Sequence, residues 1–134
     1  MIKFEFENLI IEIYDDSTFS FNSTDNSHIY SRHYSSGAAL EYPVSKHGIR
    51  ILNDGVEINN CIVIGSGGAT EVHENSVLLD ANKLLICCCN TIFCLSISDL
   101  ELLWQTQADM ATCFKIYKFE SDYLVHGELD ICNR

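Results

Sequence analysis

Residues 83–105 read KLLICCCNTIFCLSISDLELLWQ, and they hold the densest apolar run of the chain, four of its seven cysteines and its only tryptophan. Residues 84–89 are all apolar, Asn90-Thr91 is a polar pair of hairpin-turn length, and residues 92–97 resume with β-branched and aromatic side chains. The stretch therefore predicts a β-hairpin. Because apolar residues occupy nearly every position, we expect both faces of this hairpin to be covered and the hairpin to lie inside a sheet.

The segment that follows predicts a third strand over residues 102–104. The side chains of Ser98 and Asp99 can bond the local backbone and so mark a turn. A helix that begins at Ser98 or Asp99 is the alternative. We favour the strand, because so short a helix is not stable alone and its neighbours are rich in strand-forming residues.

Period-two alternation predicts strands on the N-terminal side. Ile2, Phe4 and Phe6 alternate with charged residues, and Phe19 and Phe21 alternate with polar ones. Together with the apolar run between them, they predict a three-stranded meander over residues 1–7, 9–14 and 18–22.

The next apolar residues predict a further short strand over residues 28–34, with Ile29 and Tyr34 turned inward. A bend or seam is expected near residues 35–47, where the only proline, Pro43, discourages a central strand.

Strand patterns return after this bend. Asp54-Gly55 suits a hairpin turn that needs positive φ. Strands are predicted over residues 49–52, 56–64, 77–79, 113–119, 123–129 and 129–131. We therefore expect a mainly β fold: a single domain over residues 1–134, built as an antiparallel β-meander that forms a curved or two-layer sheet with little helix.

Charge is the most informative feature for function. The 134 residues carry 19 acidic and 8 basic side chains, a formal net charge of −11. This balance argues against a typical nucleic-acid binder, which presents clustered Lys and Arg. It favours a basic partner, and the alternative is a solvated face that only keeps the protein soluble. Loop carboxylates that project from a rigid sheet speed encounter with such a partner. The candidate partner-binding carboxylates are Asp54, Glu57, Glu71, Glu74 and Asp109.

Seven cysteines without CxxC spacing are interpreted as reduced thiols that act as small hydrophobes, so we expect no metal and no cofactor. No apolar run is long enough to span a membrane, and the N-terminus lacks the pattern of a signal peptide. We therefore expect a cytoplasmic protein that binds neither membrane nor nucleic acid.

Two patterns have residue types that could carry chemistry. The loop over residues 65–70 lacks the third glycine of a dinucleotide fingerprint and the Gly-Lys ending of a P-loop, so a flexible turn is favoured. Cys113, His126, Asp109 and Glu128 have the residue types of a thiol–imidazole–carboxylate site, but nothing in their linear spacing shows that they meet. We therefore expect that the protein is not an enzyme.

Two resemblances add to this interpretation. Residues 83–105 resemble one repeat of a quinoprotein-type β-propeller, with Leu103-Trp104 as its aliphatic-Trp strand, and residues 123–131 resemble the start of another. Propellers need four or more blades of about forty residues, so this length predicts an open or curved sheet.

As a small, acidic, single-domain chain without a catalytic signature, the protein is also similar to bacterial immunity proteins of contact-dependent or polymorphic toxin systems. That resemblance implies an inhibitor that binds and neutralises a basic toxin of the nuclease kind by surface occlusion. The alternatives are a structural or adaptor β module without a toxin partner, and a small cysteine-dependent enzyme.

Overall fold

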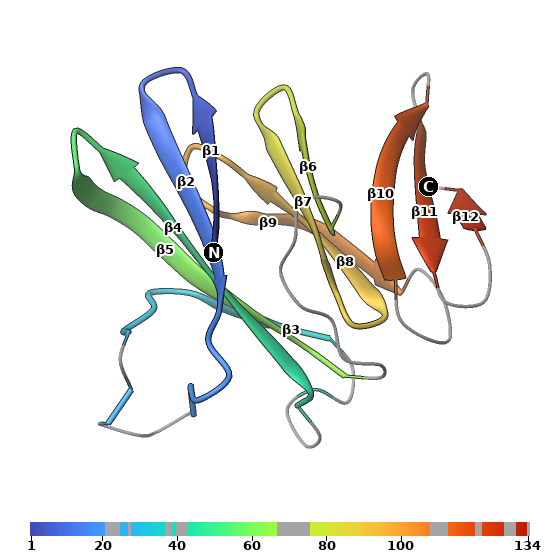
Figure 1. Cartoon of the computed structure of the whole chain (residues 1–134), viewed down its shortest axis with the longest axis horizontal. Coiled ribbons are helices and arrows are strands. Elements are labelled where there is room, and N and C mark those ends of the chain that lie inside the picture. Colours follow the sequence, from blue (N-terminus) through green and yellow to red (C-terminus); the bar gives the residue numbers. More distant parts are fainter. Residues whose placement is uncertain are drawn as a thin grey trace.

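The computed structural model describes residues 1–20, 25–26, 28–36, 39, 43–66, 76–107, 113–119, 122–127 and 131–133. These residues form twelve β-strands in three sheets that stand side by side (Figure 1). The fold is thus mainly β with largely antiparallel sheets, which confirms the fold class expected from the sequence.

The first sheet has the strand order β1-β2-β4-β5-β3, and its neighbours are antiparallel except for the parallel pair β3 and β5. Its long central strands follow from β-branched runs such as residues 10–13 and 61–64. Its five strands are β1 (Ile2–Phe6), β2 (Leu9–Asp15), β3 (His33–Ser35), β4 (Ser45–Asn53) and β5 (Val56–Gly65).

The second sheet is an antiparallel meander of four strands in sequence order. It comprises β6 (Val77–Asp80), β7 (Lys83–Cys88), β8 (Thr91–Ser96) and β9 (Leu102–Gln107). The third sheet lies with β10 against β7 and β6, and it comprises β10 (Cys113–Phe119), β11 (Asp122–Gly127) and β12 (Ile131–Asn133). The resemblance to a propeller repeat remains a prediction, because a four-stranded meander is common to many antiparallel sheets.

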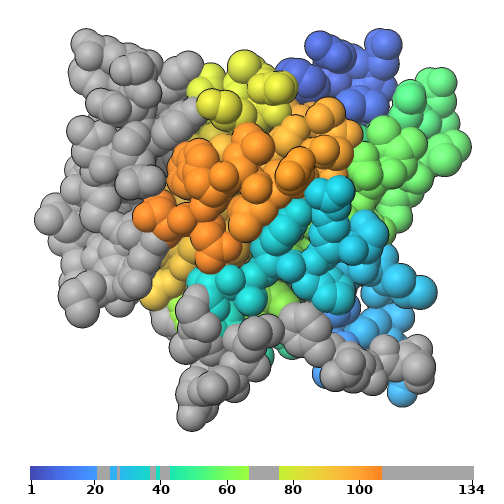
Figure 2. Space-filling view, turned by 180° about the vertical axis from the view of Figure 1, so that it is seen from behind, coloured from blue at the N-terminus to red at the C-terminus, as the bar shows by residue number. Residues whose placement is uncertain are grey.

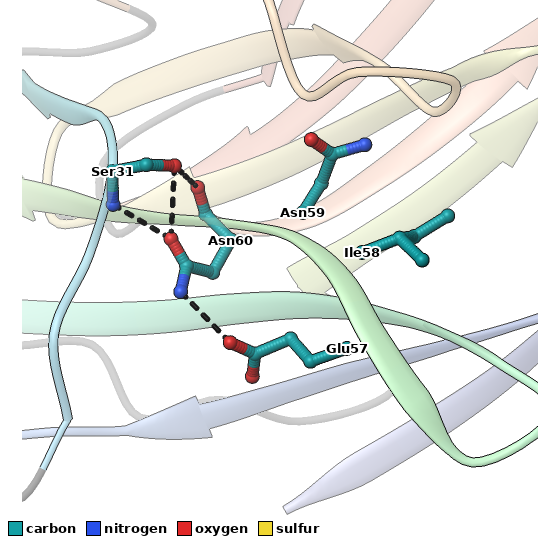
Figure 3. A pocket seen from close by; sticks show the side chains of 5 residues that line it. All are labelled: Ser31, Glu57, Ile58, Asn59 and Asn60. Carbon is teal, nitrogen blue, oxygen red and sulfur yellow. Dashed lines mark hydrogen bonds between the residues drawn. The ribbon is translucent and has the colours of Figure 1, made fainter.

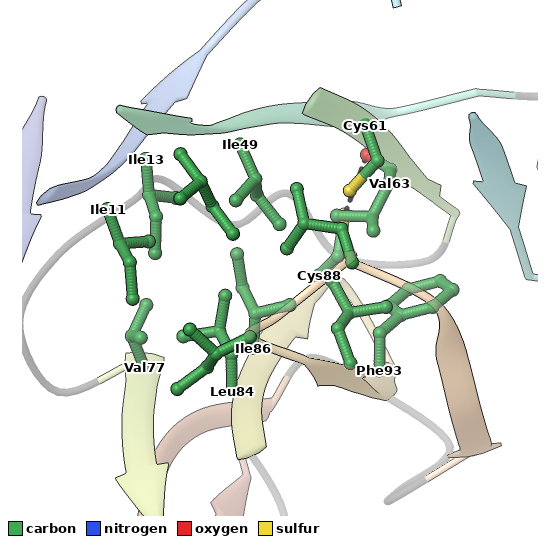
Figure 4. Close-up of a cluster of buried hydrophobic side chains, with 14 residues drawn as sticks. Ile11, Ile13, Ile49, Cys61, Val63, Val77, Leu84, Ile86, Cys88 and Phe93 are labelled. Carbon is green, nitrogen blue, oxygen red and sulfur yellow. Dashed lines mark hydrogen bonds between the residues drawn. The ribbon is translucent and has the colours of Figure 1, made fainter. Parts of the chain in front are cut away.

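The main core lies between the five-stranded and four-stranded sheets (Figure 4). Ile11, Ile49 and Val63 of the first sheet meet Ile86 and Phe93 of the second, and all five side chains are inaccessible to solvent. Burial of one such aliphatic or aromatic side chain stabilises the fold by about 1.5–3 kcal/mol.

The four-stranded sheet is apolar on its other face too. Leu85, Cys87, Ile92 and Cys94 are fully buried there, with Trp104 packed against them. The expectation that the hairpin of residues 84–97 is covered on both faces and lies inside a sheet is therefore confirmed. Its turn lies one residue earlier than predicted: Cys89 adopts a positive φ of 58°, and Thr91 already belongs to β8.

The two large sheets are joined along one side by side-chain bonds to the backbone. The Tyr34 hydroxyl donates to the Leu100 carbonyl at 2.8 Å, and Gln105 Nε2 donates to the Ser35 carbonyl at 3.3 Å. In Figure 2 the orange surface of β9 accordingly adjoins the cyan surface that includes β3. Residues 102–104 are a strand, so the helical alternative for this segment is wrong.

Two N-terminal predictions are wrong. Residues 18–20 form no strand, because Phe19 folds onto the outer face of the first sheet beside Tyr30 and leaves β2 to pair with β4. The predicted strand over residues 28–34 is reduced to the three residues of β3, and Ile29 is 87% exposed instead of buried. Residues 21–22 lie outside the described part.

Candidate functional site

The two halves of β5 have opposite surroundings. Its last five residues are buried in the core, whereas its first five are exposed or half-buried. Within the outer half, Val56 is 64% exposed and Ile58 is 46% exposed. Large aliphatic side chains exposed next to each other on a rigid strand are typical of interaction surfaces.

A β-bulge sets the position of Ile58. Ile51 of β4 pairs with Asn59, whereas the next residue, Leu52, pairs with Glu57, so Ile58 is the extra residue of β5. A bulge of this kind increases the local twist and re-aims side chains. Ile58 consequently lies outside the core although its strand neighbours Cys61 and Ile62 are fully buried.

The turn before β5 has the conformation that its sequence predicts. Asp54 has a φ of 52° and Gly55 a φ of 79°, and both central residues of a type I′ hairpin turn need positive φ. The turn fixes the register at the end of the hairpin, where Asn53 pairs with Val56. Asp54 is therefore held at the tip of a rigid hairpin.

A hydrogen-bonded network ties the outer half of β5 to the segment before β3 (Figure 3). Asn60 Oδ1 accepts from the Ser31 backbone N–H at 2.7 Å and from its hydroxyl at 3.0 Å. Asn60 Nδ2 donates to the Ile29 carbonyl at 2.8 Å and to Glu57 Oε2 at 2.9 Å. A shallow depression of about 200 Å³ lies here, lined by Ser31, Glu57, Ile58, Asn59 and Asn60.

The same segment is anchored a second time through Tyr30. Its hydroxyl donates to Asp16 Oδ2 at 2.6 Å and lies 3.1 Å from the Tyr14 hydroxyl, and its ring meets Phe19 edge to face. Burial first, and then the hydrogen bond to Asp16, raises the pKa of Tyr30 well above its ordinary value. Gly48 lies beneath these rings, and a Cβ there would come within 2.5 Å of Tyr14 and Tyr30.

Charged residues cross the outer face of the first sheet in one row. Lys3, Glu12, Arg50 and Asn60 are direct cross-strand partners on β1, β2, β4 and β5. Glu12 is buried, and it accepts from Arg50 Nε and pairs with Lys3 at 3.2 Å. Burial alone would raise the pKa of Glu12, but the hydrogen bonds and charges of Arg50 and Lys3 outweigh it and lower that pKa.

Carboxylates gather at the end of the molecule that carries the β4–β5 turn. Leu9 pairs with Asn53, which places the turn of Glu7 beside the turn of Asp54. Asn59 Nδ2 donates to the Ser98 carbonyl at 3.0 Å, which brings the turn of Asp99 to the same end. This end therefore presents negative charge from three neighbouring turns.

Two arginines reduce this negative field. Arg50 Nη1 lies 3.7 Å from Glu57 Oε1, so part of the charge of Glu57 is neutralised within the protein. A hydrogen bond with Tyr34, and then the charges of Asp99 and Glu101, raise the pKa of Arg32. Asp54 and Glu7 are exposed in the turns themselves, so they are more available to a partner than Glu57 is.

The structure places two of the five predicted carboxylates. Asp54 and Glu57 lie together at the outer end of the β4–β5 hairpin, Asp54 in the turn and Glu57 on the strand. Glu71, Glu74 and Asp109 lie outside the described residues. We call the exposed surface formed by Asp54, Val56, Glu57, Ile58, Asn59, Asn60 and Ser31 the β5 patch.

Sequence reasoning missed the apolar part of the β5 patch. Val56 and Ile58 are two residues apart, a spacing that predicts one inward-facing side of a strand, yet both side chains are exposed. The available signal was Asn59-Asn60, an adjacent polar pair in a mostly apolar strand. The partner of Asn60, Ser31, comes from a segment 29 residues away, so no local pattern indicates that contact.

Two of the four residues named for a thiol–imidazole–carboxylate site lie on the third sheet. Cys113 pairs with Gly127 and Lys115 with His126, which places Cys113 and His126 on neighbouring strands, while Asp109 and Glu128 lie outside the described part. Among the residues that the structure describes, five cysteine side chains are buried, and burial raises the pKa of one of them, Cys61, to about 12; they are those of Cys61, Cys87, Cys88, Cys89 and Cys94.

The described residues hold neither a metal-ligand cluster nor a membrane-spanning helix. No three His, Cys, Asp or Glu side chains within that part of the chain converge as metal ligands would. That part also contains no helix of the length and apolarity needed to cross a bilayer.

No protein-family description, curated protein or solved structure gives a significant match.

Proposed function

We propose that this protein is a binding module of the immunity type, which holds a basic protein toxin on the β5 patch and blocks it by surface occlusion. The observation that carries the proposal is the exposure of Val56 and Ile58, at 64% and 46%, directly beside Asp54 and Glu57. Apolar residues surrounded by charge suit a partner with a basic rim and an apolar centre.

The rigidity of the β5 patch supports the same proposal. The inner half of β5 is fixed in the core, and the outer half is fixed by the bonds of Asn60 to Ser31 and Glu57. Binding therefore costs little ordering of the backbone, which favours affinity. The net charge of −11 would speed encounter with a basic partner and slow it with an acidic one.

The roles within the β5 patch differ. Ile58 and Val56 supply the desolvated contact, because aliphatic side chains lose water on binding without an electrostatic cost. Asp54 steers the partner, since it lies at an exposed turn. Glu57 is held by Arg50 and Asn60, so it acts as a fixed acceptor.

The test starts with the purified protein as bait in lysate of its own source, at low and then high salt, with mass spectrometry of what is retained. We expect one basic protein, whose association with the bait slows as salt rises to physiological strength. If that protein is a nuclease, its activity should fall in stoichiometric proportion to added bait.

Two matched variants then locate the surface. Ile58→Ser should weaken binding of the retained protein by about tenfold or more, the scale of an interface anchor. Leu103→Ser is the control, because Leu103 is also a bulge residue, on β9, and is 47% exposed. Absence of any basic protein at either salt, or equal binding by Ile58→Ser and wild type, would refute the proposal.

A further inference from the structure

β1 is an edge strand with a regular two-sided pattern. Within the described residues it pairs only with β2, at the end of the five-stranded sheet. Ile2, Phe4 and Phe6 pack against the main core and are only partly buried, whereas Lys3 and Glu5 are exposed on the opposite face. Open edges of this kind are templates for pairing with another strand.

The hairpin turn determines which backbone groups of β1 are open. Phe6 and Leu9 flank the two-residue turn of Glu7 and Asn8, and in such a hairpin the flanking residues form a hydrogen-bonded pair. Bonded and non-bonded pairs alternate along an antiparallel ladder. The N–H and C=O groups of Ile2, Phe4 and Phe6 therefore point to β2, and those of Lys3 and Glu5 point to the open edge.

We infer that β1 pairs with β1 of a second copy of this chain, in antiparallel register around a two-fold axis at Phe4. In this register Lys3 of each copy lies opposite Glu5 of the other, and both pairs use the outward backbone groups. The other face pairs Ile2 with Phe6 and Phe4 with Phe4. The resulting interface is isologous, as most homodimer interfaces are.

Charge complementarity favours this register over the two registers that are shifted by two residues in either direction. Outward backbone groups can pair only when the register shifts by two residues. A shift in one direction places Lys3 opposite Lys3, and a shift in the other places Glu5 opposite Glu5. Like charges in direct opposition are destabilising, whereas Lys–Glu pairs are favourable.

The proposed dimer gives the exposed carboxylate of Glu5 a role. Lys3 already pairs with Glu12 at 3.2 Å and is 59% exposed, so it can contact a second carboxylate. Glu5 lies opposite Ile10 of β2, and no ion pair links Glu5 to any other described residue. The dimer leaves the β5 patch free, because β5 lies three strands away from β1.

The first experiment uses the wild-type protein at physiological salt, where long-range repulsion between two acidic copies is screened. Sedimentation velocity from micromolar to near-millimolar concentration should show a monomer–dimer equilibrium. Amide hydrogen exchange should show that protection of Lys3 and Glu5 rises with the dimer fraction. A monomer at every concentration, or a dimer without added protection at these two amides, would overturn the proposal.

Charge reversal provides the second experiment. Glu5→Lys should raise the dimer dissociation constant by about tenfold or more, because both Lys–Glu pairs become Lys–Lys pairs. Lys3→Glu should act likewise, and an equimolar mixture of the two variants should form a heterodimer in which every pair is complementary. Glu101→Lys is the control for net charge, since Glu101 is exposed before β9 and should leave the dimer intact.

The outcomes are distinguishable even if a variant folds poorly. Lys3→Glu places a carboxylate beside buried Glu12, so its fold is checked by circular dichroism. If it does not fold, Glu5→Lys and the wild-type exchange data decide. Unchanged dimerisation of Glu5→Lys, or two folded variants that stay monomeric when mixed, would refute the proposed register.

Discussion

The two large sheets bury their strands by different means. The four-stranded sheet is apolar on both faces, with Ile86 and Phe93 on one side and Leu85 and Ile92 on the other. The five-stranded sheet is apolar toward the core, whereas its outer face carries a smaller apolar cluster around Phe19 and Tyr30 and the charged row that includes buried Glu12. The stability of the four-stranded sheet depends on shape and area, whereas that of the five-stranded sheet also depends on each charge keeping its partner.

The largest expected effect concerns the shared core. Phe93→Ala should lower the free energy of unfolding by about 3–5 kcal/mol, because it leaves a cavity between two sheets that cannot both collapse. Urea denaturation followed by circular dichroism measures the loss. Leu103→Ala, on the next strand but 47% exposed, is the control and should cost less than about 0.5 kcal/mol. Equal losses would show that the interface between the sheets is loosely packed.

The charged row should respond less strongly but more selectively. Arg50→Met should lower the free energy of unfolding by about 2 kcal/mol, less than the about 3–5 kcal/mol of a fully buried pair, because Lys3 still contacts Glu12 and Arg50 is one-third exposed. The double variant Glu12→Leu with Arg50→Met should be more stable than Arg50→Met alone, since no buried charge is left. Strict additivity of the two changes would contradict direct coupling.

The smallest expected effect is a pH dependence of the free energy of unfolding that arises from Glu12 in the first sheet. The folded-state pKa of Glu12 lies below its ordinary value of 4.5, so ionised Glu12 stabilises the fold above about pH 4.5, and that contribution is lost as pH falls below it. The difference in unfolding free energy between wild type and Glu12→Gln should therefore shrink between about pH 5 and pH 3. A difference that stays constant over this interval would mean that Glu12 is not the titrating group.

Two stretches of the chain, residues 84–97 and residues 18–20, show what the sequence could and could not predict about the fold. Residues 84–97 are apolar at nearly every position, and their two strands pair with each other as one hairpin. Their local pattern was therefore sufficient to predict β7 and β8. Residues 18–20 show the same alternation as a strand, but Phe19 is buried by Tyr30 from a distant segment. Alternation therefore reports that a side chain needs burial, not which partner provides it.

The same division holds for the β5 patch. Asp54-Gly55 encodes its turn directly, through a φ that glycine and aspartate tolerate. The exposure of Ile58 depends on a bulge against Ile51 and Leu52, which is a property of two strands together. Glu12 is an acidic residue whose charge is neutralised within the protein, and no local pattern shows this, because its countercharges on β1 and β4 meet it only in the folded sheet.

The parallel pair β3 and β5 has a consequence for synthesis on the ribosome. Ser35 pairs with Ile64, so β3 has no ladder partner until the chain is 29 residues longer. At about 5–20 residues per second, that interval lasts a few seconds. The hairpin of β1 and β2 can form during this time. Tyr34 and its neighbours in β3 have no strand to pair with until β5 has been synthesised. The segment of β3 therefore stays without a ladder partner until the inner half of β5, residues 62–64, has been made.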